Sequence, residues 1–217
     1  MHTLIISGGT IDTDFALDLL KKEKYDHIIG VDGALKFCKE QNIVPTRIVG
    51  DFDTLDPEIL TWYQTNTQIE IRQFNPVKDA TDTQIAIELA MELGSRKITL
   101  VGGTGTRLDH VLGNIQTLYL PFAKGIDCRI VDAHNRIRLV SGELHLKMTE
   151  QWGKYVSLIP FTTDVEGVDL IGFKYPLEKF SFTVLGTGSR GVSNEIAEEE
   201  AVIRIEKGIM ILVESKD

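Results

Sequence analysis

The sequence contains few cysteines and no excess of basic residues, and both features narrow its possible functions. Its two cysteines, Cys38 and Cys128, lie in apolar stretches far apart and lack the spacing of a metal or redox motif, so we expect reduced core residues. The formal net charge of −9 repels a phosphate backbone, and no Lys/Arg stripe compensates for it locally. We therefore expect no nucleic acid partner. Locally dense negative charge instead favours a divalent cation or a cationic substrate.

Long apolar runs are also missing. No stretch reaches the roughly 18 consecutive apolar residues of a membrane-spanning helix. The run at residues 4–6 is too short for the core of a signal peptide and follows no basic leader. We therefore expect a cytoplasmic protein that does not bind a membrane. Its 217 residues, 42% hydrophobic and 25% charged, are enough for a folded core and leave one or two domains open.

Up to about residue 132, short β-branched runs alternate with helical stretches. The runs expected to form strands are residues 4–6, 28–31, 47–49, 69–71, 98–101 and 129–131. The clearest helix spans about residues 81–93; Ile85, Leu89 and Leu93 are spaced by four, and Gly94 is placed as the cap beyond its end. This alternation predicts a parallel sheet covered on both faces by helices.

From about His134 the pattern changes to strand-like runs separated by turns, with no convincing helix. The expected strands are residues 136–140, 144–148, 155–159, 180–185, 201–205 and 209–213, with turns at Ser141-Gly142 and Lys207-Gly208. The fold class predicted is therefore α/β plus all-β. Residues 1–132 form a parallel-sheet α/β domain, and residues 133–217 form a small antiparallel β-sandwich or barrel.

The segments that follow the predicted parallel strands all carry glycine, carboxylate or both. In an open parallel sheet, ligands bind beyond the carboxyl ends of the strands, so these segments are candidates for a binding site. They are Ser7-Gly8-Gly9-Thr10, Asp32-Gly33, Gly50-Asp51-Phe52-Asp53, Lys78-Asp79-Ala80-Thr81-Asp82 and Gly102-Gly103-Thr104-Gly105-Thr106-Arg107-Leu108-Asp109-His110.

Asp51 and Asp53 are two residues apart, so in an extended loop their carboxylates point the same way while Phe52 points into the core. Carboxylates gathered at one sheet edge repel each other. Unit charges about 4 Å apart cost about 1 kcal/mol in water and about 4 kcal/mol at an effective dielectric of about 20. A cation must offset this repulsion, and an oxygen-rich site without Cys or His ligands suits Mg²⁺. Scattered aspartates on a solvated surface are the alternative.

Three further candidates stay open on the residues alone. Asp79 and Asp82 are three apart at a helix start, where either can cap backbone N–H groups or reach a cation; for Asp79 both roles are open. His110 has either an acid–base role or a packing role. The loop at residues 186–195 is a binding loop, in which Ser193 and Asn194 would contact the edge of a heterocycle, or a long polar turn.

The loop at residues 102–109 allows close approach of backbone N–H groups to phosphate. Arg107 adds a planar donor fork that suits phosphate oxygens. Neither a Walker A sequence nor a GxGxxG fingerprint is present, which disfavours P-loop and ordinary dinucleotide-binding proteins.

Five motifs, in this order along nearly the whole chain, resemble those of bacterial thiamine pyrophosphokinases. They are Gly50-Asp51-Phe52-Asp53-Thr54-Leu55, Lys78-Asp79-Ala80-Thr81-Asp82, Gly102-Gly103-Thr104-Gly105-Thr106-Arg107-Leu108-Asp109-His110, Ser157-Leu158-Ile159-Pro160 and Gly191-Val192-Ser193-Asn194-Glu195. The resemblance implies transfer of an intact diphosphate from ATP to the hydroxyl of thiamine, giving thiamine diphosphate and AMP, with Mg²⁺ required. It also implies a homodimer, with the nucleotide on the α/β domain and thiamine near the β domain at the subunit boundary.

The same resemblance implies roles for individual residues. Asp51, Asp53 and Asp82 would be metal ligands. Asp79 and Arg107 would lie near the phosphates, and Asp109 close to the reacting hydroxyl. The residues expected around the nucleotide are Asp32, Gly33, Lys78, Thr81, Gly102, Gly103, Thr104 and Gly105, and those expected at the pyrimidine are Ser193 and Asn194.

Two positions depart from the family pattern. Thr54 stands where serine is commoner, and Thr106 replaces a glycine, which narrows the backbone freedom of the phosphate loop.

Two other functions compete with this one. A related diphosphokinase acting on another alcohol, such as a pterin, would keep the metal aspartates but have no use for the Ser193-Asn194 pair. A catalytically silent nucleotide or thiamine sensor would tolerate loss of Asp82 or Asp109, and both are present.

Overall fold

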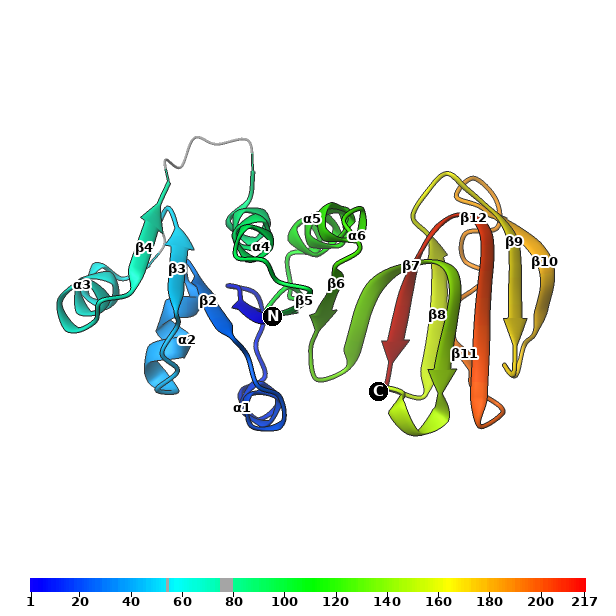
Figure 1. Cartoon of the computed structure of the whole chain (residues 1–217), viewed down its shortest axis with the longest axis horizontal. Coiled ribbons are helices and arrows are strands. Elements are labelled where there is room, and N and C mark those ends of the chain that lie inside the picture. Colours follow the sequence, from blue (N-terminus) through cyan, green and yellow to red (C-terminus); the bar gives the residue numbers. More distant parts are fainter. Residues whose placement is uncertain (54, 75–79) are drawn as a thin grey trace. The chain divides into compact units, whose positions relative to one another are not determined.

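The computed structural model describes residues 1–53, 55–74 and 80–217, which divide into two compact units, Met1–Ala133 and His134–Asp217 (Figure 1). The strands of each unit are described separately below. Among the described residues, no helix has the length and apolar character needed to cross a membrane.

The first unit contains a parallel sheet with the spatial order β6-β5-β1-β2-β3-β4. Its strands are β1 (His2–Ile6), β2 (His27–Val31), β3 (Arg47–Gly50), β4 (Glu70–Gln73), β5 (Lys97–Val101) and β6 (Asp127–Val131). Each predicted run forms a strand with nearly the expected bounds, and the parallel α/β prediction is confirmed. Cys38 and Cys128 are both buried and free, as predicted.

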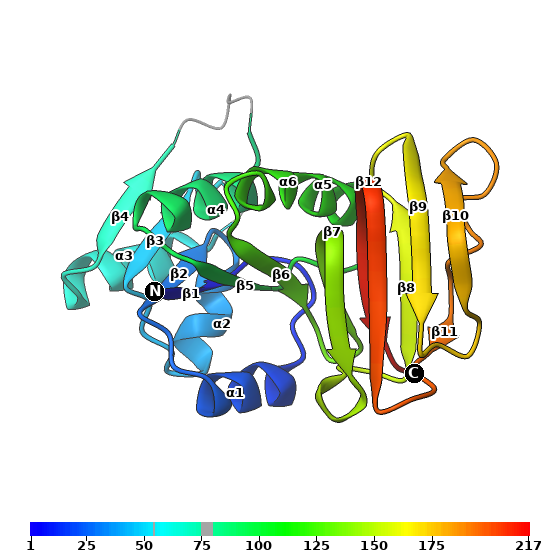
Figure 2. The same ribbon diagram turned by 45° about the vertical axis from the view of Figure 1, so that its right-hand side comes forward.

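Helices cover both faces of this sheet. They are α1 (Thr13–Lys22), α2 (Ala34–Glu40), α3 (Pro57–Asn66), α4 (Asp82–Glu92), α5 (Leu108–Thr117) and α6 (Tyr119–Phe122). Figures 1 and 2 show α1 and α2 on one face, and α4, α5 and α6 on the other. The chain runs outward from β1 to β4 and then returns to place β5 on the other side of β1. The loops after β1 and β5 therefore diverge from a topological switch point, where open α/β sheets bind their ligands.

The predicted helix at residues 81–93 is confirmed as α4. Thr81 is its N-cap, with a side-chain oxygen that accepts a hydrogen bond from the Gln84 N–H at 3.2 Å, and Gly94 follows its end with φ +83°. The buried face differs in detail from the predicted spacing. Leu89 is buried as expected, but its buried neighbours on α4 are Ala86, Ile87 and Ala90. Two of these neighbours are alanines, and the helix packs on β1, β2 and β3.

The second unit is antiparallel. Its strands are β7 (Asn135–Lys147), β8 (Tyr155–Pro160), β9 (Asp164–Ile171), β10 (Leu177–Thr183), β11 (Asn194–Glu195) and β12 (Glu200–Ser215), with a short 3₁₀ turn, η1 (Met148–Glu150). The first half of β12 pairs with β9 and the second half with β8, while β7 pairs along both halves. The two sheet halves enclose an apolar core that includes Val165, Phe182, Ile203 and Met210. The β-sandwich prediction is confirmed.

The predicted turns at Ser141-Gly142 and Lys207-Gly208 are wrong. Both pairs lie inside continuous strands, β7 and β12, where the register shifts between Ile205 and Met210. Gly142 and Gly208 adopt φ of +67° and +99°, so they bend the long strands instead of ending them. Strand β9 was not predicted, because Gly167 at φ +65° interrupts its alternation of polar and apolar residues.

A buried ion pair joins the two long strands of the sandwich. Glu214 is 0% exposed. Its two carboxylate oxygens accept hydrogen bonds from Arg136 Nε at 2.7 Å and Nη2 at 2.5 Å. Breaking a buried pair is costly because it leaves the partner's charge buried without compensation.

We predict that Glu214→Gln lowers the free energy of unfolding by about 3 kcal/mol, measured by urea denaturation. Glu198→Gln, at an exposed position of the same unit, is the matched control and should change stability by less than about 0.5 kcal/mol. Equal stabilities of the two variants would contradict a role for the pair in holding β7 against β12.

Candidate functional site

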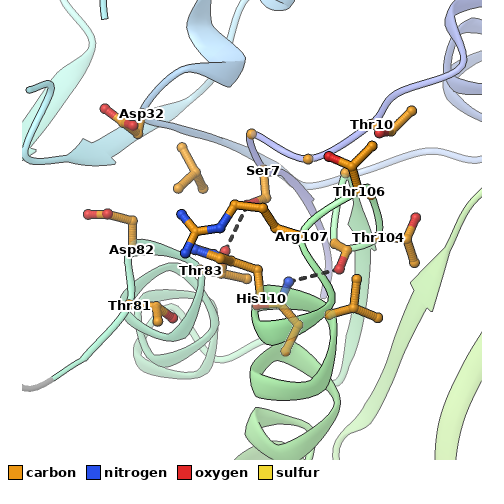
Figure 3. A pocket seen from close by; sticks show the side chains of 18 of the residues that line it. Ser7, Thr10, Asp32, Thr81, Asp82, Thr83, Thr104, Thr106, Arg107 and His110 are labelled. Carbon is orange, nitrogen blue, oxygen red and sulfur yellow. Dashed lines mark hydrogen bonds between the residues drawn. The ribbon is translucent and has the colours of Figure 1, made fainter. Parts of the chain in front are cut away.

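A pocket of about 650 Å³ lies at the carboxyl ends of the parallel strands in the first unit. It is formed by the loops that follow β1, β2, β3 and β5, together with the first turns of α4 and α5. The lining residues are Ser7, Gly8, Gly9, Thr10, Val31, Asp32, Asp51, Asp53, Thr81, Asp82, Thr83, Gly102, Gly103, Thr104, Gly105, Thr106, Arg107, His110, Val111 and Asn114. In Figure 3, Asp32 and Asp82 lie on one side of this pocket, and Thr10 and Thr104 on the other.

Two loops meet at the switch point and are joined through their backbones. Gly9 N–H donates to the Gly102 carbonyl at 2.9 Å, and Thr10 N–H donates to the Thr104 carbonyl at 2.8 Å. A Cβ on Gly9 would lie 2.2 Å from the Thr104 oxygen, and Gly102 has φ +71°. Both positions therefore require glycine, and the two loops form one glycine-rich wall of the pocket.

Side chains tie this wall to the surrounding elements. The hydroxyls of Ser7 and Thr83 are hydrogen-bonded at 2.7 Å (Figure 3). The Asn114 amide on α5 donates to the Gly103 carbonyl at 2.8 Å. Sequence reasoning gave no role to Thr83 or Asn114. The signal that could have found them is the presence of a polar residue on the apolar, buried face of each helix, because such a residue needs a partner.

Carboxylates gather on the other side of the pocket. Asp32, Asp51 and Asp53, hereafter the acid cluster, each offer an oxygen, and these oxygens lie within 4.8 Å of one another. The negative charge of Asp51 is the main cause that raises the pKa of Asp53, and the charges of Asp32 and Asp82 add to it. This donor set fits Mg²⁺, which binds carboxylate oxygens and tolerates water and phosphate as further ligands.

The carboxylates of Asp51 and Asp53 converge by a different geometry from the one predicted. Phe52 is buried, as expected, but its φ is +62°, so the loop is not extended at this residue. The turn allows the Asp53 N–H to donate to Asp51 Oδ1 at 3.3 Å. The predicted extended geometry is wrong at Phe52. Burial of the Phe52 side chain outweighs the ordinary backbone preference for a negative φ.

Arg107 and Asp109 form an ion pair at the start of α5. Arg107 Nη2 lies 2.6 Å from Asp109 Oδ2, and both side chains are exposed. The hydrogen bonds from Arg107 are the main cause that lowers the pKa of Asp109. Arg107 and His110 line the pocket, whereas Asp109 is not among the lining residues.

The remaining predicted nucleotide residues are placed as follows. Thr81 and residues 102–105 line the pocket, but Gly33 does not, and a Cβ there would meet no atom within 4 Å. Thr106 lines the pocket without a positive φ, so the loop accepts threonine in place of glycine. Thr54, Lys78 and Asp79 lie outside the described residues. Asp82 lines the pocket in the first turn of α4.

The two residues expected at a heterocycle belong to the second unit. The Asn194 side chain bonds to the backbone of Tyr175: Oδ1 accepts from its N–H at 3.0 Å, and Nδ2 donates to its carbonyl at 2.8 Å. Ser193 is exposed, has φ +60°, and donates its N–H to Ser157 Oγ at 3.0 Å. Asn194 therefore has a structural role, and it fixes the loop that presents Ser193.

Comparison with known proteins covers both units. Residues 16–130 match the family described as "Thiamin pyrophosphokinase, catalytic domain", and residues 142–210 match "Thiamin pyrophosphokinase, vitamin B1 binding domain". The curated thiamine pyrophosphokinase of Bacillus subtilis is 34% identical over 195 residues, which cover 87% of each chain. A rice relative, thiamine pyrophosphokinase 1, is 27% identical over 170 residues, covering 73% of this chain and 61% of its own.

Solved structures agree with the sequence matches. The thiamine pyrophosphokinase structure from Bacillus subtilis aligns over 100% of both chains with a TM-score of 0.86 and 30% identity. The one from Geobacillus thermodenitrificans aligns over 100% of this chain and 98% of its own, with a TM-score of 0.86 and 31% identity. The chain therefore belongs to the thiamine pyrophosphokinase family.

Proposed function

We propose that this chain transfers the diphosphate group of ATP to the hydroxyl of thiamine, giving thiamine diphosphate and AMP. The observation that carries this proposal is the pocket at the β1/β5 switch point, where a glycine-rich wall faces carboxylates. The glycine-rich wall suits phosphate, and the carboxylates suit a divalent cation. Both features lie in a chain of the thiamine pyrophosphokinase family. In the reaction, the thiamine oxygen bonds to the β-phosphorus of ATP, the bond between that phosphorus and the α–β bridging oxygen breaks, and the hydroxyl proton is released.

Mg²⁺ is the proposed cofactor, held by Asp51, Asp53 and Asp82, with Asp32 nearby. The raised pKa of Asp53 supports this assignment, because it reflects a concentration of negative charge that a cation would relieve. When bound, the ion supplies charge neutralisation at the transferred diphosphate. The chain's own contribution is to fix the carboxylates in place before the nucleotide binds.

The phosphates are proposed to lie along the glycine-rich wall formed by residues 7–10 and 102–105. Close backbone approach is possible there because Gly9 and Gly102 have no side chain. Arg107 offers its guanidinium from the N-terminal end of α5, and it would exchange its bond with Asp109 for phosphate oxygens. Phosphoryl transfer depends mainly on such positioning and charge stabilisation, so no nucleophilic side chain is required.

Asp109 is the residue proposed to act on the thiamine hydroxyl. Before substrates bind, the hydrogen bonds from Arg107 lower the pKa of Asp109. Once Arg107 has exchanged these bonds for phosphate oxygens, Asp109 would accept a hydrogen bond from the hydroxyl and so orient the oxygen or take its proton. The roles of Lys78 and Asp79 at the phosphates remain proposals from the motif match.

Thiamine is proposed to contact Ser193 and Asn194, as the motif match implies. The positively charged thiazolium would favour a carboxylate-rich cleft. We propose a cytoplasmic location, where ATP and Mg²⁺ are abundant; fractionation that places the protein elsewhere would refute this.

A homodimer with sites at the subunit boundary is also proposed. It is supported by an apolar stripe on α5 and α6, where Leu108, Leu112 and Tyr119 are 71%, 64% and 46% exposed. Their spacing of four and seven residues places them on one helical face. Sedimentation equilibrium should give twice the mass of the chain, and a monomer at micromolar concentration would contradict the proposal.

The activity is tested by incubating the purified protein with Mg-ATP and thiamine and separating the products. We predict equal amounts of AMP and thiamine diphosphate, since one diphosphate moves per turnover. ADP with thiamine monophosphate would refute diphosphate transfer. Binding of thiamine without any product would support the silent sensor instead.

The metal assignment is tested by Asp51→Asn. We predict that turnover falls at least about a hundredfold, because a metal ligand is lost. The melting temperature in EDTA should stay the same or rise, since the variant removes a repelling charge. Asp18→Asn, on the exposed surface of α1, is the control and should change neither quantity. Full activity in Asp51→Asn would contradict the assignment.

The raised pKa of Asp53 predicts a pH dependence of metal binding. A proton competes with the cation for this carboxylate, so Mn²⁺ affinity should fall as the pH drops through the raised pKa. Without metal, the stability of the folded chain depends on pH in the opposite direction. The protonated form is favoured in the folded state, so this contribution to stability is present at low pH and is lost as the pH rises through the raised pKa. Titration of Asp53→Asn should lack both effects, and unchanged pH profiles in this variant would assign them to another group.

Arg107 is tested through the product of the reaction. Arg107→Ala should lower kcat by about 10³-fold, and Arg107→Lys by less, because lysine keeps the charge but lacks the planar fork. AMP formation at saturating thiamine measures both. Equal rates in wild type and Arg107→Ala would exclude Arg107 from charge stabilisation.

A further inference from the structure

Phe52 lies between Asp51 and Asp53 in the sequence, and its backbone conformation is unfavourable. Its φ is +62°, in the left-handed region, where a bulky side chain is rarely found. Asp32, the third member of the cluster, also has a positive φ, +43°. Strain of this kind persists only where the surrounding structure enforces it, and it is concentrated at functional sites.

The packing of the Phe52 ring supplies the force that maintains this conformation. Its side chain is 8% exposed and belongs to a buried cluster with Leu35, Ile48, Ile59 and Tyr63. The ring is thus held by the end of β3, by α2 and by α3. Releasing it to relax the backbone would expose an aromatic side chain to water.

Gly50 allows the ring to lie directly beneath the acid cluster. A Cβ at this position would lie 2.9 Å from Phe52 Cε1 and 3.1 Å from Asp32 Cα. The first distance is too short for a real Cβ and the second is tighter than most real Cβ contacts, so the absence of a side chain at Gly50 lets the ring and the Asp32 backbone pack against the same point. The ring edge therefore lies beside the backbone of Gly50 and near that of Asp32.

The left-handed turn determines where the carboxylates lie. In an extended chain the Cα atoms of residues 51 and 53 would be separated by about 6.6 Å, at about 3.3 Å per residue. With the turn at Phe52, the Asp53 N–H reaches Asp51 Oδ1, and the carboxylate oxygens of both lie within 4.8 Å of each other and of Asp32. A change of the backbone at Phe52 would separate them.

We propose that Phe52 is a positioning residue: its buried ring holds the backbone turn that makes Asp51 and Asp53 converge on one divalent cation. The inference rests on the proposed metal site. It adds that the affinity of this site is set by a side chain that has no metal-binding atom of its own. Small losses of geometry in such a supporting residue are known to weaken metal sites by about 10- to 100-fold.

The test compares Phe52→Leu with Leu19→Ala. Leucine keeps an apolar side chain in the core but lacks the ring edge that reaches Gly50. Leu19 is buried on α1 and is not a member of the cluster around Phe52, so its truncation controls for general destabilisation. Mn²⁺ binding without nucleotide is compared in the two variants from the EPR signal of the free ion, and the melting temperature is measured in parallel.

The expected result is a Mn²⁺ affinity about tenfold lower in Phe52→Leu. Leu19→Ala should bind Mn²⁺ like wild type despite an equal or larger loss of thermal stability. Gly50→Ala is a second variant for the case that Phe52→Leu does not fold. It keeps the ring but displaces it, and it should also weaken Mn²⁺ binding.

Wild-type affinity in Phe52→Leu, or an equal loss of affinity in Leu19→Ala, would overturn the role of Phe52 while leaving the metal site intact. Absence of Mn²⁺ binding in the wild-type protein, or a wild-type affinity that Asp51→Asn does not change, would overturn the metal site and the positioning role together.

Discussion

The carboxylates of the acid cluster lie close enough to repel one another, and the proposed chemistry of the whole candidate site follows from this repulsion. The fold brings Asp32, Asp51 and Asp53 within 4.8 Å of one another, although the charge of Asp51 raises the pKa of Asp53 as a result. The parallel pairing of β2 and β3 enforces this arrangement, since the Asp32 N–H donates to the Val49 carbonyl at 2.9 Å. The fold thus accepts repulsion between carboxylates at this edge of the sheet, a cost that the proposed cation would offset.

The glycine-rich wall meets the complementary requirement, a surface close enough and positive enough for phosphate. The sheet topology creates it, because the loops after β1 and β5 come from the two strands at the switch point. Glycine at positions 9 and 102 allows the backbones to meet, and Asn114 holds the Gly103 carbonyl from the neighbouring helix. The glycine-rich wall and the acid cluster therefore face one pocket, the arrangement that the proposed transfer from a magnesium nucleotide requires.

The sequence predicted those features that depend on local pattern. Parallel strands appear as β-branched runs, α4 has a capping residue at each end, and the loops after the strands are marked by glycine and aspartate. The sequence could not reveal features that depend on contacts distant along the chain. Phe52 adopts a positive φ because of a core built from α2, β3 and α3, and the Arg107–Asp109 pair depends on side-chain conformations. In the second unit, Gly142 and Gly208 suggested turns, but pairing over the whole length of β7 and β12 keeps these strands continuous.

The central claim is that the acid cluster binds the divalent cation that accompanies the nucleotide. Anomalous diffraction from crystals grown with Mn²⁺ and α,β-methylene-ATP, whose α–β linkage cannot be cleaved, tests it most directly. We predict an anomalous peak at coordination distance, about 2.0–2.6 Å, from carboxylate oxygens of Asp51 and Asp53, with the phosphates along residues 102–105. A nucleotide bound in the pocket with its Mn²⁺ away from both aspartates would contradict cation binding by the acid cluster.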